Sequence, residues 1–121
     1  ARMKLVVNMI MGGMMASFCE GLALADRGGL DASDLLDVLA AGALANPMFA
    51  VKGDLIRRGE FGPAFPLKHM QKDLRLAGEL GDILVQSLPV AQAAGGVFEE
   101  ALAEGLGDAD FCAFYRTVRR D

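Results

Sequence analysis

The chain has 121 residues, of which 53% are hydrophobic and 23% charged, a composition typical of one globular domain. Sixteen acidic side chains outnumber twelve Lys and Arg, giving a net charge of −4. This excess argues against a surface that binds nucleic acid or an anionic membrane, so we expect any bound phosphate to be held locally.

The first predicted helix covers residues 1–27 and ends at the pair Gly28-Gly29, because the segment has no proline and glycine is a common C-cap. It is apolar nearly all round, which predicts a helix buried among others. Its small residues would let a neighbouring backbone approach closely, within the domain or across a dimer. They are Gly12, Gly13, Ala16 and Ser17.

We do not interpret this helix as a membrane span or a signal peptide. Its most apolar stretch, residues 5–19, is short for a bilayer crossing and contains Asn8, Ser17 and paired glycines. Arg2 and Lys4 precede the stretch as in a signal peptide, but the helical pattern continues to Asp26 without a cleavage-like site.

Two shorter helices are predicted next. The first has Asp31 or Ser33 as its N-cap and ends at Gly42. The second begins at the pair Asn46-Pro47, since proline suits the first helical position, and runs in one or two pieces to Arg58.

Residues 59–66 are predicted to form the one true loop, with two prolines and two glycines in eight residues. Loops on rigid scaffolds often carry chemistry, so this segment is a candidate site element. A helix then covers residues 67–80 and ends at Gly81 as its C-cap. Its predicted inward residues are Leu67, Met70, Leu74 and Ala77.

Pro89 begins a helix that we expect to extend to about Glu104, and Asp108 or Asp110 should cap a last helix through Arg119. The predicted inward residues of the first of these are Val90, Ala93, Ala94, Val97, Phe98 and Ala101. No segment alternates like a strand, and no G-x-G-x-x-G follows one. The sequence therefore predicts an all-α domain, a compact bundle of six or seven helices around the long apolar first helix.

Lys4 and Asn8 are the first candidate site residues, because they lie one helical turn apart on an otherwise apolar helix. An ammonium and an amide on one face could bind a carbonyl oxygen. The alternative is a solvated lysine near a chain terminus and an asparagine bonded to nearby backbone.

A second candidate cluster directly follows the proline-rich loop. Lys68, Lys72 and Arg75 form an i, i+4, i+7 stripe that could meet a phosphate or a carboxylate. The alternative is an ordinary solvated face. Phe65 and Asp73 lie beside this stripe, as does His69, for which a general-base role is the weaker interpretation because the sequence offers no partner.

Cys19 and Cys112 are too few for a disulfide framework, and their apolar surroundings suggest small hydrophobic side chains in a reducing compartment. Their spacing relative to the single histidine predicts no zinc site. The first helix is also rich in methionine, which we interpret as core or interface packing. These residues are Met3, Met9, Met11, Met14 and Met15.

Four segments together resemble the C-terminal domain of the β-hydroxyacid dehydrogenase family, also described as 3-hydroxyisobutyrate dehydrogenase-like. They are residues 3–12, 20–25, 46–49 and 65–77, and they include a lysine followed by an asparagine four positions on and a lysine-aspartate-leucine run. The resemblance covers the chain end to end, and the nearest branch is similar to the glyoxylate and succinic semialdehyde reductases.

This resemblance implies a helical fold like the C-terminal domain of 6-phosphogluconate dehydrogenase, in a two-domain enzyme. An N-terminal Rossmann domain, absent from this chain, would hold most of the NADP or NAD. Residues 1–121 would be the domain that closes over the cofactor and builds a homodimer or homotetramer. We therefore expect the isolated chain to be inactive, with no nucleic acid, membrane or metal among its partners.

The resemblance also implies roles for individual residues. Lys4 matches the catalytic lysine, which would act as general acid on the substrate oxygen, and Asn8 matches the asparagine that orients the substrate or the lysine. Lys72 matches the lysine near the nicotinamide end of the cofactor. Asp73 would order the local charges, and Phe65 would form a wall of the pocket that excludes water.

Two alternatives to an NADPH-dependent reductase of glyoxylate and succinic semialdehyde remain open. The domain could be a non-catalytic dimerisation or interaction module, although nuclear, chromatin-associated relatives of this family lack the lysine found here at Lys4. A sister dehydrogenase of 3-hydroxyisobutyrate or tartronate semialdehyde is also possible. Cytoplasm is the default expectation for its location.

Overall fold

The computed structural model describes residues 1–120. Within these residues the structure is all-α, as predicted, with six α-helices, one short 3₁₀ helix and no strand. The elements are α1 (Arg2–Arg27), α2 (Ala32–Ala41), α3 (Pro47–Arg58), α4 (Leu67–Leu84), α5 (Pro89–Ala103), η1 (Phe111–Ala113) and α6 (Phe114–Arg119).

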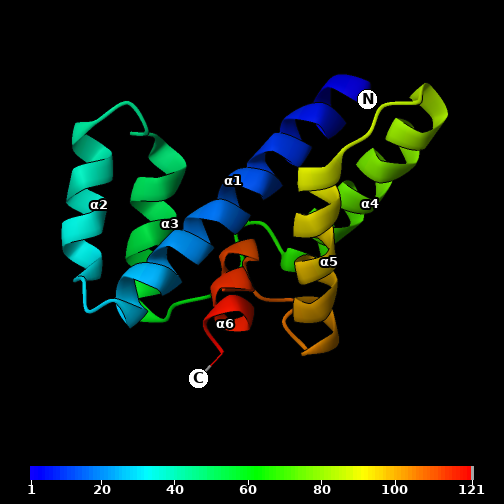
Figure 1. Cartoon of the computed structure of the whole chain (residues 1–121). Helices are drawn as coiled ribbons and strands as arrows, with labels where there is room; N and C mark the ends of the chain where they lie inside the picture. Colours follow the sequence, from blue (N-terminus) through cyan, green and yellow to red (C-terminus); the bar gives the residue numbers. More distant parts are fainter. Residues whose placement is uncertain (121) are drawn as a thin grey trace.

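The long helix α1 runs through the middle of the molecule and organises the other helices (Figure 1). The α2–α3 pair lies on one side of it, α4 and α5 lie on the other, and α6 packs against its C-terminal half. The core forms where α1, α4, α5 and α6 meet. Its largest fully buried hydrophobic side chains are Phe98, Phe111, Phe114, Met15, Leu67 and Met70.

The predicted ends of the first three helices are confirmed. Gly28 is the C-cap of α1, and the carboxylate of Asp31 accepts a hydrogen bond from the Ser33 backbone at the start of α2. Asn46 caps α3, which runs in one piece to Arg58 and has Gly59 as its C-cap. Gly59 has a φ of 68°, a left-handed conformation that glycine adopts without a steric penalty. Local capping chemistry therefore determines these boundaries.

Helix α1 was predicted to lie buried among other helices, but within residues 1–120 it is buried along one side only. Only one stripe faces the core, made of Gly12, Met15, Phe18, Cys19, Leu22 and Ala25. Met3 is 76% exposed and Leu24 is 75% exposed, and Val7 and Ile10 are also exposed. The other helices pack against the core-facing stripe, so the opposite apolar side of the helix has no neighbour within residues 1–120.

Among the described residues, α1 is also the one helix long and apolar enough to cross a membrane, and 28% of its most apolar window is buried. Core helices of soluble proteins meet the same criteria of length and composition. Our interpretation of this helix as part of a globular domain therefore stays a prediction.

The predicted end of the fourth helix at Gly81 was wrong, since α4 continues to Leu84 and is capped by Val85. Gly81 serves a different purpose. A Cβ at this position would lie 2.8 Å from the carbonyl oxygen of Gln86 and 2.9 Å from Cδ1 of Leu88. The glycine therefore lets the chain fold back closely against α4 on its way to α5.

In the last third of the chain, Ala94, Phe98 and Ala101 are buried as predicted, and Val97 is half-buried. Val90 and Ala93 were wrongly placed inside, because they lie on the side of α5 that faces away from the core, whereas Ala91 packs against it. The two alternative caps predicted for the last helix have different roles in the structure. Asp110 caps η1, from which α6 continues, whereas Asp108 forms an ion pair with Lys68.

Candidate functional site

The two sequence motifs meet where α1 crosses α4. The helices approach closely at Gly12, where a Cβ would lie 2.8 Å from Sδ of Met70. One turn nearer the N-terminus, Nδ2 of Asn8 donates a hydrogen bond to Oδ2 of Asp73, with 2.8 Å between the two atoms. Residues that are 65 positions apart in the sequence therefore form one part-buried pair.

This pair sets the orientation of the Asn8 amide. An ionised carboxylate only accepts hydrogen bonds, so the amide nitrogen must face Asp73 and the amide oxygen must face away from it. Asn8 consequently offers an acceptor oxygen and one remaining N–H to a ligand. The alternative that Asn8 is bonded to nearby backbone was wrong, because its partner is a side chain of another helix.

Lys4 and Lys72 lie next to this pair in the sequence, one helical turn before Asn8 and one residue before Asp73. Both lysines are exposed. Within residues 1–120, neither ammonium forms a hydrogen bond or an ion pair. Two unpaired cations therefore accompany the Asn8–Asp73 pair, and they are free to bind an anionic or carbonyl oxygen.

The rest of the basic stripe is neutralised by nearby carboxylates. Nζ of Lys68 lies 2.7 Å from Oδ1 of Asp108, and this hydrogen bond lowers the pKa of the Asp108 carboxyl. Arg75 pairs with Glu79 one turn along, at 2.9 Å. Both pairs are well exposed and resemble an ordinary solvated face. Of the three stripe cations, Lys72 is the one left available.

Phe65 is half-buried at the end of the loop before α4. Its ring packs edge-on against Phe111, with the ring centroids 5.5 Å apart, and lies 6.3 Å from the ring of His69. His69 itself is exposed. Within the described residues the imidazole makes no hydrogen bond or ion pair, so this structure gives a general-base role for His69 no further support.

Sequence reasoning missed one polar pair, Lys52 and Asp110. Asp110 was predicted only as a helix cap, yet its side chain is fully buried and its Oδ1 lies 2.9 Å from Nζ of Lys52. The available signal was the position of an acidic residue in the apolar run 109–114. An aspartate there requires a buried partner.

The two cysteines lie in the core as predicted, and both are free thiols. Sγ of Cys19 lies 3.6 Å from Sδ of Met15 and 4.0 Å from the carbonyl oxygen of Cys112. Burial raises the pKa of both thiols, to about 12 for Cys112. They therefore behave as small hydrophobic side chains.

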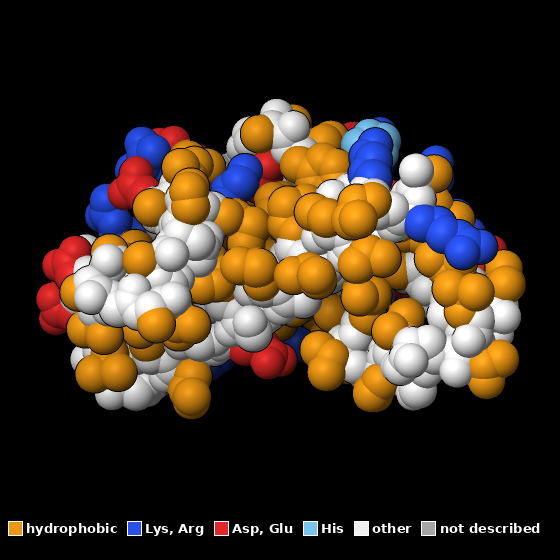
Figure 2. All heavy atoms as spheres, turned by 90° about the horizontal axis from the view of Figure 1, so that it is seen from above, with side chains coloured by type: hydrophobic (Ala, Val, Ile, Leu, Met, Phe, Trp, Pro, Cys, Tyr) orange, Lys and Arg blue, Asp and Glu red, His pale blue; other side chains and the backbone are white. Residues whose placement is uncertain are grey.

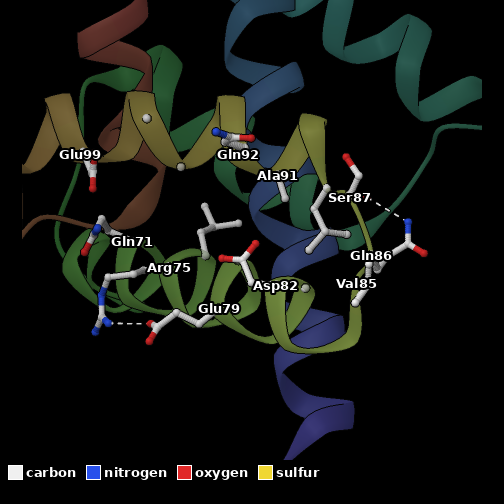
Figure 3. A pocket seen from close by; sticks show the side chains of 16 residues that line it. Gln71, Arg75, Glu79, Asp82, Val85, Gln86, Ser87, Ala91, Gln92 and Glu99 are labelled. Atoms are coloured by element: carbon white, nitrogen blue, oxygen red, sulfur yellow. Dashed lines mark hydrogen bonds and ion pairs between the residues drawn. The ribbon is translucent and has the colours of Figure 1, made fainter.

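A groove of about 890 Å³ lies between α4 and α5 (Figure 3). Its polar lining comes from both helices and from the turn between them, and includes Gln71, Arg75, Glu79, Asp82, Gln92 and Glu99. Lys4, Asn8, Lys72 and Asp73 are not among its lining residues. The groove is therefore distinct from the cluster at the crossing of α1 and α4, by which we mean the Asn8–Asp73 pair and the neighbouring Lys4 and Lys72.

The cluster lies on a molecule with much apolar surface. In a view from above, hydrophobic side chains cover a broad area across the middle of the molecule, and Lys and Arg side chains lie mainly toward the margins (Figure 2). Helix α1 also has exposed apolar residues, which include Met3, Val6, Val7 and Ile10. The N-terminal half of α1 thus carries Lys4 and Asn8 together with exposed apolar side chains.

Comparison with known proteins places these observations in a family. A family model described as the NAD-binding domain of NADP-dependent 3-hydroxyisobutyrate dehydrogenase matches residues 1–118. Glyoxylate/succinic semialdehyde reductase 1 of Arabidopsis thaliana is 55% identical over 119 residues, which are 98% of this chain and 41% of the relative. Cytokine-like nuclear factor N-PAC of Aedes aegypti is 44% identical over 118 residues, which are 98% of this chain and 21% of the relative.

The fold has solved counterparts as well. A crystal structure of 3-hydroxyisobutyrate dehydrogenase from Salmonella typhimurium matches with a TM-score of 0.90 and 27% identity, over 95% of this chain and 40% of that one. The chain therefore spans less than half the length of each of these proteins.

Proposed function

This chain belongs to the family of NAD-binding domains of NADP-dependent 3-hydroxyisobutyrate dehydrogenases, and from this premise we propose that it is the C-terminal catalytic half of an NADPH-dependent reductase. Its substrates would be small aldehyde acids, glyoxylate and succinic semialdehyde, which it reduces to the hydroxy acids. The 55% identity to the Arabidopsis reductase supports this substrate class.

The observation that carries the proposal is the state of Lys4. Its ammonium is exposed and has no partner within residues 1–120, one turn from an amide whose orientation is fixed. When an aldehyde is reduced, negative charge develops on its oxygen. An ammonium within hydrogen-bond reach stabilises this charge and can deliver the proton. Lys4 is thus the general acid in this mechanism.

In this mechanism, Asp73 orients the side-chain amide of Asn8. Because Asp73 binds one N–H of the Asn8 amide, the amide cannot turn, and its oxygen stays directed away from Asp73. This oxygen can accept a hydrogen bond from the Lys4 ammonium or from the hydroxyl of the hydroxy-acid product. Holding the acceptor in place before substrate binds reduces the reorganisation needed in the reaction.

The residues present fit a nicotinamide cofactor. Lys72 is a free cation next to Asp73, and the half-buried ring of Phe65 precedes the same helix. When bound, the cofactor supplies the hydride. Lys72 would hold the nicotinamide end, and Phe65 would exclude water from this region. Most of the cofactor would be bound by an N-terminal Rossmann domain outside this chain, so we expect residues 1–121 alone to show no turnover.

The experiment is a pair of substitutions in the full-length enzyme. Lys4→Ala should lower kcat with glyoxylate by about 100- to 10,000-fold, the usual contribution of a general acid, and leave the Kd for NADPH nearly unchanged. Arg2→Ala removes an exposed cation two residues away and should keep full activity. Comparable activity in Lys4→Ala would contradict the mechanism.

Activity measurements on the same full-length protein also test two alternative functions. The identity to nuclear factor N-PAC motivates a non-catalytic dimerisation or interaction module, which predicts no turnover even in the full-length protein. A sister dehydrogenase would instead prefer 3-hydroxyisobutyrate or tartronate semialdehyde, so kcat/KM across these substrates and the two aldehyde acids distinguishes them. We further propose a homodimer or homotetramer in the cytoplasm.

A further inference from the structure

The loop that carries Phe65 has no regular structure of its own, and it is held by the segment that follows α5. The backbone N–H of Asp110 donates to the carbonyl oxygen of Phe61 at 2.9 Å, and that of Phe111 donates to the carbonyl oxygen of Phe65 at 2.8 Å. Leu67 donates in turn to the carbonyl oxygen of Ala109 at 2.8 Å. These bonds fix both ends of the loop to residues 109–111.

The side chain of Asp110 binds two backbone donors of this loop. Pro63 and Pro66 have no N–H, so Ala64 and Phe65 provide the only backbone donors between 63 and 66. Both donate to Oδ1 of Asp110, each at 3.0 Å. Both backbone donors between Pro63 and Pro66 therefore bond to one oxygen atom of a buried carboxylate.

Lys52 of α3 binds the same oxygen atom. Its Nζ lies 2.9 Å from Oδ1 of Asp110, and its side chain is only 11% exposed. The ammonium also lies 5.5 Å from the centroid of the Phe111 ring, which in turn packs edge-on against Phe65. Lys52 therefore contacts both structures that fix the position of Phe65, the carboxylate and the neighbouring ring.

A buried ion pair is a poor way to gain stability, because removing two charges from water offsets most of their attraction. Apolar residues of similar volume could join α3 to η1 equally well. They could not supply the acceptor for the N–H groups of Ala64 and Phe65, nor hold that acceptor in one place. The charged pair is thus suited to fixing the geometry of the loop.

We propose that Lys52 and Asp110 are positioning residues for Phe65: they hold the loop 59–66 so that this ring forms a wall of the substrate pocket. The proposal rests on the proposed function in one respect, the contact of Phe65 with the substrate. Neither Lys52 nor Asp110 touches the substrate itself. Their effect on the reaction passes through the loop backbone.

The test compares four variants of the full-length enzyme. Lys52→Met removes the cation, and Lys52→Arg preserves it. Arg57→Met is the matched control, because Arg57 lies on the same helix in an exposed ion pair with Asp54. Phe65→Leu reports whether the ring matters to the reaction at all. For each variant, KM and kcat are measured with glyoxylate and NADPH, and hydrogen exchange is measured at the amides of Ala64 and Phe65.

We expect Lys52→Met to raise KM about tenfold with a smaller change in kcat, because a displaced wall weakens positioning of the substrate. Exchange at the two amides should also become about tenfold faster, since their acceptor is no longer held. Lys52→Arg should restore both readouts, and Arg57→Met should match the unmodified enzyme.

Normal KM and normal exchange in folded Lys52→Met would overturn the proposal. If the Tm of this variant were lower while KM and exchange were unchanged, the pair would contribute to stability only, and the proposal would also be overturned. If Lys52→Met does not accumulate, Asp110→Glu replaces it, because the added methylene displaces the carboxylate without removing its charge. Unchanged kinetics and exchange in that variant would also overturn the proposal. An unaffected Phe65→Leu would instead contradict the proposed role of Phe65, while faster exchange in Lys52→Met would still support the control of the loop.

Discussion

At the scale of single residues, the buried carboxylate of Asp110 shows how environment controls ionisation. Burial by itself raises the pKa of this group. The hydrogen bonds from Phe65, Cys112 and Lys52 favour the charged form and outweigh burial, so the net pKa lies below the usual value. The side chain therefore stays ionised at neutral pH inside an apolar core.

This lowered pKa predicts a specific dependence of stability on pH. The folded-state pKa of Asp110 lies below the unfolded value of about 3.9, so its ionised form contributes stability above that value and loses the contribution as pH falls through the folded pKa. Asp110→Asn leaves Lys52 buried without its charged partner and should cost about 3 to 5 kcal/mol at pH 7. Urea unfolding at pH 7, 5 and 3 measures both effects.

The variant should lose less stability than the unmodified chain between pH 5 and pH 3, because it has no carboxylate to protonate at this position. Asp37→Asn is the control, because Asp37 is exposed and forms no ion pair within residues 1–120, so its carboxylate is screened by water. It should reproduce the pH dependence of the unmodified chain. Parallel curves for Asp110→Asn and the unmodified chain would show that Asp110 does not carry the effect.

The Asn8–Asp73 pair allows a second prediction at this scale. Asn8→Asp places two carboxylates in contact, which should lower the Tm at pH 7 because like charges repel in a part-buried site. Near pH 4 the two groups can share a proton, so the loss should shrink. Thermal unfolding at both pH values provides the measurement.

The matched control exchanges the amide and the carboxylate between the two positions. Asn8→Asp combined with Asp73→Asn restores one amide donor and one carboxylate acceptor, so its Tm at pH 7 should return most of the way to that of the unmodified chain. A loss of Tm in Asn8→Asp that is the same at pH 7 and pH 4 would rule out charge repulsion as its cause.

At the scale of elements, the turn between α4 and α5 is strained. Val85 ends α4 with a φ of 56°, in the left-handed region that β-branched residues avoid. Its side chain is 92% exposed and provides little packing in return. The chain returns here within van der Waals distance of Gly81, which leaves this cap little freedom to relax.

Val85→Gly should therefore stabilise the chain by about 1 kcal/mol, because glycine adopts this conformation without a steric penalty. The free energy of unfolding from urea titration tests this. Val90→Gly serves as the control, since Val90 is also exposed but lies in the first turn of α5. The same change there should destabilise by up to about 1 kcal/mol, and a loss of stability in Val85→Gly would contradict the account of strain.

At the scale of the whole molecule, the exposed apolar side of α1 requires explanation. A large contiguous apolar surface on a folded domain marks a site of association. Met3, Val6, Val7 and Ile10 lie on the N-terminal half of this helix, each at least 43% exposed. This surface is the reason that we expect assembly through the helical domain.

The prediction is that the 121-residue chain self-associates at micromolar concentration, and that Ile10→Lys weakens this association by about tenfold or more, since a buried unpaired charge is costly. Sedimentation over a range of concentrations measures it. Leu30→Lys is the matched control, because Leu30 is 64% exposed but lies in the turn after α1. A chain that is monomeric at every concentration would argue that another domain covers this surface.

The sequence by itself determined the local structure and the family. Asp31, Asn46 and Gly59 decide where helices begin and end because a cap needs only residues within one turn. The spacing of Leu67, Met70, Leu74 and Ala77 determined which side of α4 is buried, since a helix repeats every 3.6 residues. The family resemblance identified the candidates Lys4, Asn8, Lys72 and Asp73, whose roles stay predictions.

Only the tertiary structure decided how these parts meet. The bond between Asn8 and Asp73 and the ion pair between Lys52 and Asp110 join residues 65 and 58 positions apart, and they depend on how the helices cross. The continuation of α4 past Gly81 and the exposure of one side of α1 also depend on which neighbours are present. Periodicity and capping are local properties of a chain, whereas the partner of a buried polar group is set by the packing of whole elements.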